Sequence, residues 1–119
     1  MSEIKLIRIY EHEQPQGYRM LVDRLWPRGM SKIKANLDEW DKQIGPSNDL
    51  RKWFNHDDEK FPEFEKKYIA ELDQNDFTPE FIKTVKTALT KGDVLFLYGA
   101  KNKEHNQAVV LKKYVENKL

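Results

Sequence analysis

A short block in the N-terminal third of the chain concentrates side chains suited to binding an anion. The acid Asp23 lies beside Arg24, and Trp26 separates that pair from Arg28. Guanidinium groups stay charged and bind phosphate or carboxylate through paired hydrogen bonds. An aromatic ring between two arginines can also stack on a base while the arginines hold phosphate. The alternative is structural: each arginine pairs with an acid such as Asp23 or Asp57 and fixes a loop.

Asp23 itself has two candidate roles, as a base or as the partner that holds Arg24. We favour the holding role, because neighbouring guanidinium groups keep a carboxylate ionised. Two more cations extend the predicted site: Arg51 belongs to a predicted helix, and Lys101 follows a predicted strand. The predicted ligand-binding residues are Asp23, Arg24, Trp26, Arg28, Arg51, Lys101 and Asn106.

Histidines are the candidate proton-transfer groups, because imidazole titrates near neutral pH. The sequence places His105 in the first turn of the last predicted helix and His56 after the helix that carries Arg51. Each suits hydrolysis or transfer at a phosphate or N-glycosidic bond, and each has a structural hydrogen-bonding role as its alternative. The chain has no HExxH cluster, dinucleotide fingerprint, P-loop or GxSxG elbow, so we expect neither a metal nor a cofactor.

Two strands are expected to bring these residues together. A predicted strand over Tyr18–Leu25 contains a continuous apolar run, and a proline and a glycine after it end the pairing. Val94–Tyr98 is wholly apolar and is predicted to be the centre of the sheet. The long helical region between the two strands allows a parallel pairing. Asp23, Arg24 and Lys101 then emerge together at the carboxyl edge, where α/β proteins bind ligands.

The remaining elements follow from apolar spacing and from capping residues. Ile4–Tyr10 is a predicted strand that either forms a hairpin with the next strand or runs parallel to it. Residues 30–35 are expected to form a loop. Five helices are predicted, and they start at or just after Asn36, Ser47, Pro62, Thr78 and Asn102.

Together these elements predict one small α/β domain over residues 1–119. We expect a three-layer-like fold, in which a short, mainly parallel sheet of about three strands is covered by about five helices. A hydrophobic fraction of 39% supports a folded core, and a net charge of +1 gives no general attraction to nucleic acid or to an anionic membrane. The chain has no cysteine and no membrane-spanning run, which fits a cytoplasmic protein. From the cationic site we expect its partner to be a small phosphorylated or anionic ligand, either a nucleotide or a nucleic-acid end. The oligomeric state is left open.

Several blocks of the sequence resemble the DUF488 family, and in particular its short, YeaO-like branch. The blocks cover nearly the whole chain and occur in the expected order. They are Leu21–Gly29, Pro46–Ser47 with Leu50–Phe54 and His56, Leu97–Tyr98, and Ala100–Lys101 with His105–Asn106 and Ala108. The resemblance implies a compact α/β domain and no particular reaction.

The chain departs from the wider family at two positions of chemical interest, where a cysteine and an arginine are absent. That family often has a Cys-His-Arg cluster near the last helix, where this chain has Glu104, His105 and Asn106. The shared features are therefore the Asp23–Arg24 pair and the histidine. Three functions remain in competition: an anion-binding pocket, a hydrolase or transferase that uses His105 or His56, and a non-catalytic interaction module with a structural arginine and tryptophan network.

Overall fold

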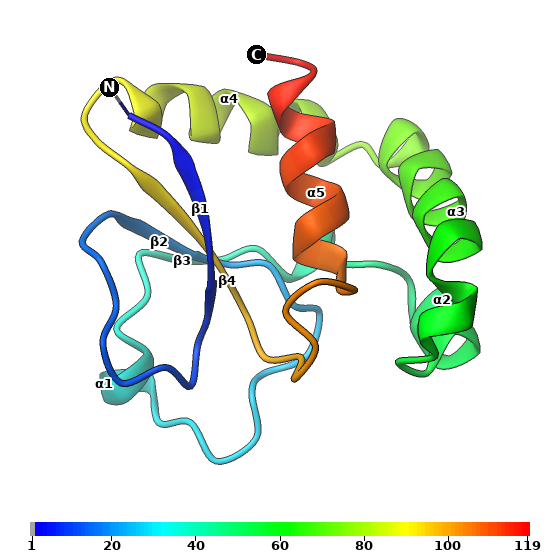
Figure 1. Cartoon of the computed structure of the whole chain (residues 1–119). Coiled ribbons are helices and arrows are strands. Elements are labelled where there is room, and N and C mark those ends of the chain that lie inside the picture. Colours follow the sequence, from blue (N-terminus) through cyan, green and yellow to red (C-terminus); the bar gives the residue numbers. More distant parts are fainter. Residues whose placement is uncertain (1) are drawn as a thin grey trace.

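The computed structural model describes residues 2–119, and a four-stranded sheet with all strands parallel lies at its centre (Figure 1). The strand order is β1-β4-β2-β3. Their bounds are Ile4–Arg8 for β1, Tyr18–Leu21 for β2, Glu39–Trp40 for β3 and Val94–Tyr98 for β4. The α/β class is confirmed, and the sheet has one strand more than the three expected because β3 adds a short edge.

β4 is the centre of the sheet, as its unbroken apolar sequence predicted. It pairs in parallel with β1 on one side and with β2 on the other, and Phe96 lies opposite both Leu6 and Met20. The predicted parallel pairing of the strands at Tyr18 and Val94 is therefore confirmed. The hairpin alternative for the first strand is wrong, because β4 lies between β1 and β2.

The two faces of the sheet are buried against different helices. One face packs on α2 (Asn48–Phe54), α3 (Phe61–Gln74), α4 (Thr78–Leu89) and α5 (Gln107–Glu116), and the other on α1 (Lys32–Ala35). Val94, Phe96 and Tyr98 face the larger core, which the helices α2 to α5 complete. Leu95 and Leu97 point to the opposite face, because successive side chains of a strand alternate. That face has a smaller core, covered by α1 and by apolar side chains of the segment 26–37. Both faces of β4 are consequently out of contact with water.

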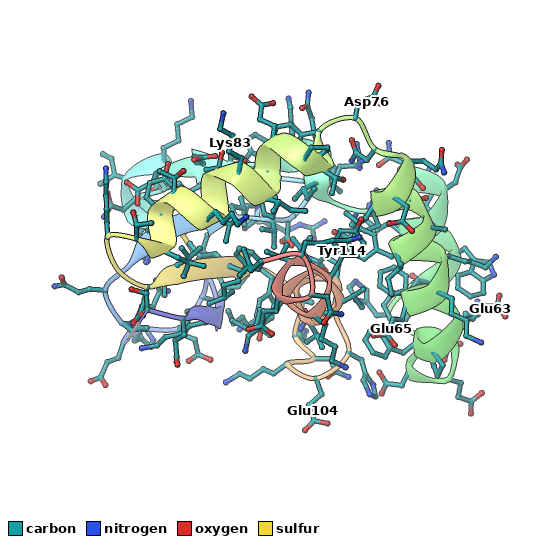
Figure 2. The ribbon with its side chains drawn as sticks, turned by 90° about the horizontal axis from the view of Figure 1, so that it is seen from above. Glu63, Glu65, Asp76, Lys83, Glu104 and Tyr114 are labelled. Atoms are coloured by element: carbon teal, nitrogen blue, oxygen red, sulfur yellow. The ribbon has the colours of Figure 1, made fainter. Side chains whose placement is uncertain are left out.

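The helices gather mainly on one side of the sheet (Figure 1). Figure 2 looks down α5 and shows α4 and α3 on either side of it. Tyr114 of α5 donates a hydrogen bond of 2.7 Å to Asp73 of α3. No helix in residues 2–119 is both long enough and apolar enough to cross a bilayer. The α-helices are α1 Lys32–Ala35, α2 Asn48–Phe54, α3 Phe61–Gln74, α4 Thr78–Leu89 and α5 Gln107–Glu116, and two 3₁₀ helices are Lys42–Ile44 and Asp58–Lys60.

The predicted helix after Asn36 is wrong, and so is the predicted loop over residues 30–35. Asn36 has a left-handed backbone (φ 46°) and ends α1 by donating its N–H to the carbonyl of Lys32. The chain then extends and pairs with β2 as β3, and a 3₁₀ turn follows at Lys42–Ile44. The spacing of the apolar residues Leu37, Trp40 and Ile44 fits a helix, but pairing with β2 decides the conformation.

Two element ends also differ from the prediction, while one cap agrees with it. Ser47 caps α2, since its hydroxyl accepts a hydrogen bond from the N–H of Leu50. The last helix begins later than expected, because Asn106 rather than Asn102 supplies its capping oxygen. β2 ends at Leu21 rather than at Leu25, and the turn that follows places Asp23 at the end of the sheet.

Candidate functional site

A cavity of about 700 Å³ opens at the carboxyl ends of β2 and β4, and we call it the carboxyl-end cavity. Its walls come from the segments that follow β1, β2 and β4, together with α2 and the start of α5. The structure places nearly all the predicted site residues around it, and His105 alone lies outside the lining. The predicted residues in the walls are Asp23, Arg24, Trp26, Arg28, Arg51, His56, Lys101 and Asn106.

Asp23 joins the ends of β2 and β4 at the base of this cavity. Its Oδ2 accepts a hydrogen bond of 2.8 Å from the backbone N–H of Gly99, and its Oδ1 accepts one from the amide of Gln107. A Cβ added at Gly99 would lie 3.1 Å from Asp23 Oδ2, which is tighter than ordinary packing. The close approach of the two strand ends therefore depends on a glycine at this position.

The role expected for Asp23 as the holder of Arg24 is wrong. The carboxylate is bonded to Gly99 and Gln107, and burial raises its pKa to about 6, against the opposing effect of those two hydrogen bonds. No arginine stands among the causes of this shift. Asp23 is thus a half-buried acid in a cation-lined cavity, with a pKa closer to neutral than that of an ordinary aspartate.

Arg24 instead fixes the turn before α2. Its Nε donates to the carbonyl of Pro46 at 2.6 Å, and one terminal nitrogen donates to the carbonyl of Gly45 at 3.0 Å. A Cβ on Gly45 would lie 2.9 Å from the backbone nitrogen of Arg24, so the two segments pack without room for a side chain there. This is the loop-locking role that the interaction-module alternative assigns to the arginines.

Arg28, Arg51 and Lys101 have few partners by comparison. Among residues 2–119, no carboxylate lies within ion-pair distance of these three cations or of Arg24. Within residues 2–119, the only hydrogen bond of the Arg51 side chain is a long one of 3.4 Å to Asn48, and its buried Nε has no partner. Four cations therefore face one open cavity without neutralisation by protein carboxylates.

Trp26 forms a fixed wall of the cavity and packs against Trp40. Trp26 donates its indole N–H to the carbonyl of Met30 at 2.6 Å and meets the ring of Trp40 edge-on at 5.2 Å. Trp40 in turn donates its indole N–H to the carbonyl of Asp23 at 2.8 Å. These bonds anchor both rings, so Trp26 lines the cavity as a rigid apolar surface.

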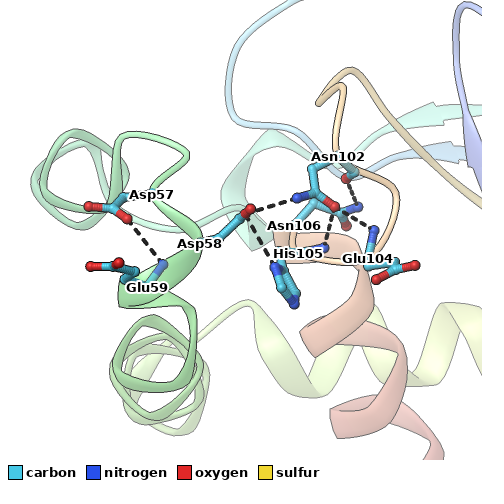
Figure 3. Close-up of polar contacts among 7 residues, drawn as sticks. All are labelled: Asp57, Asp58, Glu59, Asn102, Glu104, His105 and Asn106. Carbon is cyan, nitrogen blue, oxygen red and sulfur yellow. Dashed lines mark hydrogen bonds and ion pairs between the residues drawn. The ribbon is translucent and has the colours of Figure 1, made fainter.

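The two candidate histidines lie in different environments. His56 is exposed at the cavity wall and has a left-handed backbone with φ 56°. His105 precedes α5 instead of lying in its first turn, its ring stacks on Phe61, and its Nδ1 lies 3.2 Å from Asp58. The same carboxylate oxygen accepts a bond of 2.9 Å from Asn102, so that Asp58 joins two loops beside the cavity (Figure 3).

Sequence reasoning missed three residues that organise the site. Gln107 binds Asp23 from a position 84 residues away, and Asp58 binds Asn102 across 44 residues. Tyr10 donates its hydroxyl to the carbonyl of Arg28 at 2.8 Å. None lies in a recognisable motif, so no local signal could have found them. Within residues 2–119, no three His, Cys, Asp or Glu side chains are grouped as metal ligands would be.

Comparison with known proteins decides the family. A model described as the inactive DUF488-N3 subclade matches residues 3–119. The chain belongs to the DUF488 family. It is 44% identical over 109 residues to the uncharacterized protein YeaO of Escherichia coli, covering 91% of this chain and 92% of that protein. It is 40% identical over 72 residues to the uncharacterized protein Mb3100c of Mycobacterium bovis, covering 60% and 61%. No solved structure matches the chain.

The cavity has some of the features expected of a DUF488 protein and lacks others. The Asp23–Arg24 pair lies at the end of β2 and lines the cavity. Glu104 occupies the position where the wider family often has a cysteine, and it is exposed and outside the cavity lining (Figure 3). Asn106 is buried and caps α5 through Val109. The chain thus keeps the strand-end residues and lacks the thiol.

Proposed function

We propose that the carboxyl-end cavity binds a small anionic ligand, and in particular one that carries phosphate, without converting it. The supporting observation is that Arg24, Arg28, Arg51 and Lys101 line one cavity and make no ion pair with a carboxylate in residues 2–119. The acids in the same lining are Asp23 and Asp58. The lining has an excess of positive charge although the whole chain carries only +1.

Arg51 adds a more specific argument. A buried charged donor without a partner costs free energy, on the order of 1–3 kcal/mol or more. The buried Nε of Arg51 has no partner in the described chain, and its guanidinium makes only the long bond to Asn48. An anion bound beside Arg51 would supply acceptors for this group through paired, charge-assisted bonds.

Binding is favoured over turnover by two observations. The matching subclade is described as inactive. Of the two histidines considered as general acid or base, His105 is bound to Asp58 and stacked on Phe61 outside the cavity lining. The hydrolase alternative therefore depends on His56 alone, and loss of turnover in His56→Gln with retained binding would support it.

Calorimetric titration with inorganic phosphate tests the proposed binding. The wild-type protein should bind phosphate, and Arg51→Gln should weaken binding by about tenfold or more, because a bond to a charged group is lost. Lys83→Gln is a matched control, since Lys83 lines a different cavity at the amino ends of the strands. An absence of phosphate binding, or equal weakening by both substitutions, would contradict the proposal.

A further inference from the structure

An acid in the carboxyl-end cavity is not explained by anion binding. Asp23 carries negative charge into a space that we propose for an anion, and none of the lining cations pairs with it. An anion without other groups would bind to this cavity more tightly if a neutral residue stood in place of Asp23. The carboxylate must therefore either serve the fold alone or contact a part of the ligand that is not anionic.

Asp23 and Gln107 together present hydrogen-bond acceptors to the cavity. An ionised carboxylate accepts about four hydrogen bonds, and Asp23 receives two from the protein, from Gly99 and Gln107. Because the amide nitrogen of Gln107 points at Asp23, its carbonyl oxygen remains, and this oxygen accepts no bond from residues 2–119. Both residues line the cavity, so this part of the wall attracts donors.

The acceptors and the exposed cations lie at different depths. Asp23 and Gln107 are half-buried, whereas Arg28 and Lys101 are exposed. The acceptor pair is also held in place, because Asp23 is bonded to β4 through Gly99 and its carbonyl receives the indole N–H of Trp40. Fixed polar groups of this kind orient a ligand more than they hold it.

We infer that Asp23 and Gln107 select ligands whose anionic group is joined to a hydrogen-bond donor, which makes the ligand class a phosphate ester of a hydroxyl- or amine-bearing group. This inference rests on the proposed anion binding and adds the second half of the ligand. The cations bind the phosphate, and the acceptor pair accepts hydrogen bonds from hydroxyl or amine groups. A volume of about 700 Å³ is within the range of cavities that hold such small molecules.

The pKa of Asp23 agrees with an acceptor role at neutral pH. Burial raises that pKa to about 6, so the carboxyl group is mostly ionised at pH 7 and can accept hydrogen bonds from a ligand. Asp58, the other acid of the lining, is different, because it is largely exposed and already bonded to Asn102 and His105. Asp58 therefore offers a matched control for the removal of one negative charge from the same cavity.

The test measures affinity for three probes by calorimetry in wild type, Asp23→Asn and Asp58→Asn. Inorganic phosphate is the bare anion, ribose phosphate adds hydroxyl donors, and a dideoxynucleoside monophosphate carries an amine without sugar hydroxyls. Wild type should bind at least one ester about tenfold more tightly than phosphate, the value of one bond to a charged group. The ester that shows this advantage identifies the donor.

Asp23→Asn should abolish the advantage of the ester while leaving phosphate affinity equal or higher. Asp58→Asn should change affinity for all probes by a similar factor and keep the advantage. The asparagine oxygen can still accept the N–H of Gly99, and thermal unfolding checks that each variant folds. A second variant, Gln107→Met, should also reduce the advantage.

The outcomes separate this inference from the function on which it rests. If phosphate binds to wild type but the esters gain nothing over it, or if Asp23→Asn keeps their advantage, donor selection is overturned and anion binding stands. If no probe binds to wild type, anion binding fails and donor selection fails with it.

Discussion

Two cavities at opposite ends of β4 have nearly the same volume but very different walls. The amino-end cavity, about 720 Å³, lies at the segments that precede β2 and β4, and the carboxyl-end cavity, about 700 Å³, lies at those that follow them. The charged residues of the amino-end lining are Asp38, Glu80, Lys83, Lys91 and Asp93. Acids there outnumber lysines, whereas arginines and a lysine dominate the carboxyl end.

Few of the charged residues that line either cavity form ion pairs within residues 2–119. Asp93 at the amino end pairs with Lys5 at 3.2 Å and accepts the backbone N–H of Glu3. At the carboxyl end, Arg51 and Lys101 have no carboxylate partner among residues 2–119. Lys83 and Lys91 of the amino-end lining also form no ion pair within residues 2–119, so the sign of the lining charges, rather than cavity size or ion pairing, separates the two cavities.

Removal of two cations from each end should give the largest contrast. Arg51→Gln with Lys101→Gln should weaken phosphate binding about 100-fold, because two charge-assisted contacts are lost. Lys83→Gln with Lys91→Gln removes the same charge from the amino end, where Lys83 points outward from α4 (Figure 2), and should change affinity less than about twofold. Titrations with phosphate at two salt concentrations measure the change of affinity in both double variants. Comparable losses from the two pairs would mean that only net charge matters.

The carboxylates at the two ends of β4 should have opposite effects on the pH dependence of stability. Burial raises the pKa of Asp23 from 3.8 to about 6, so ionisation of this group destabilises the fold increasingly between those values and fully above them. The free energy of this destabilisation is at most about 3 kcal/mol. Asp23→Asn should therefore gain stability relative to wild type as the pH rises from 4 to 7, by about 1–3 kcal/mol in urea unfolding.

Asp93 should affect the pH dependence of stability in the opposite direction. The N–H of Glu3 and the ammonium of Lys5 lower its pKa below 3.8, so its ionised form stabilises the fold above that pH. Asp93→Asn should be less stable than wild type at neutral pH, and the deficit should disappear as the pH falls through the native pKa. Parallel pH profiles for the two variants would refute the contrast between the two ends.

The sequence predicted the framework of the site because hydrophobic burial determines it. β4 is apolar at every position, which predicted a place in the middle of a sheet, and the helical segments after β2 allowed the parallel pairing that the structure shows. Arg24 and Lys101 each lie three residues after the end of one of those strands, so their arrival at the same cavity could be expected. The cap at Ser47 was equally readable, since it depends on local bonds.

The parts that failed depend on partners far away in the sequence. Residues Glu39–Trp40 have helical spacing with their neighbours, yet they pair with β2. The last helix was predicted to start after Asn102, whereas Asn106 supplies its capping oxygen. The partners of Asp23 were missed for the same reason, because Gly99 and Gln107 lie 76 and 84 residues away. Arg24 is adjacent to Asp23 in the sequence, and this adjacency wrongly suggested that the two side chains are partners.

The two ends of β4 also differ in the space around the glycines that flank the strand, Gly92 and Gly99. An alanine Cβ at Gly99 would lie 3.1 Å from Asp23 Oδ2, and that carboxylate is fixed by two hydrogen bonds. Gly99→Ala should therefore cost about 1–2 kcal/mol of stability and weaken ligand binding. Gly92→Ala, at the amino end, meets nothing within 4 Å and should be neutral or stabilising by up to about 1 kcal/mol. Equal losses would show that glycine flexibility matters at both ends, and not the approach to Asp23.

The contact between Asp58 and His105 should give the smallest effect, and it tests whether that histidine belongs to the site at all. The pair joins two loops beside the carboxyl-end cavity, but both side chains are substantially exposed, so a contribution of only about 0.2–1 kcal/mol is expected. His105→Gln should accordingly lower the melting temperature slightly and leave the affinity for phosphate unchanged, because the ring lies outside the cavity lining. His56→Gln is the matched substitution at a histidine that does line the cavity. If His105→Gln lost more affinity than His56→Gln, His105 would belong among the ligand contacts. A stability loss as small as the one expected here does not by itself weaken the binding of an anion.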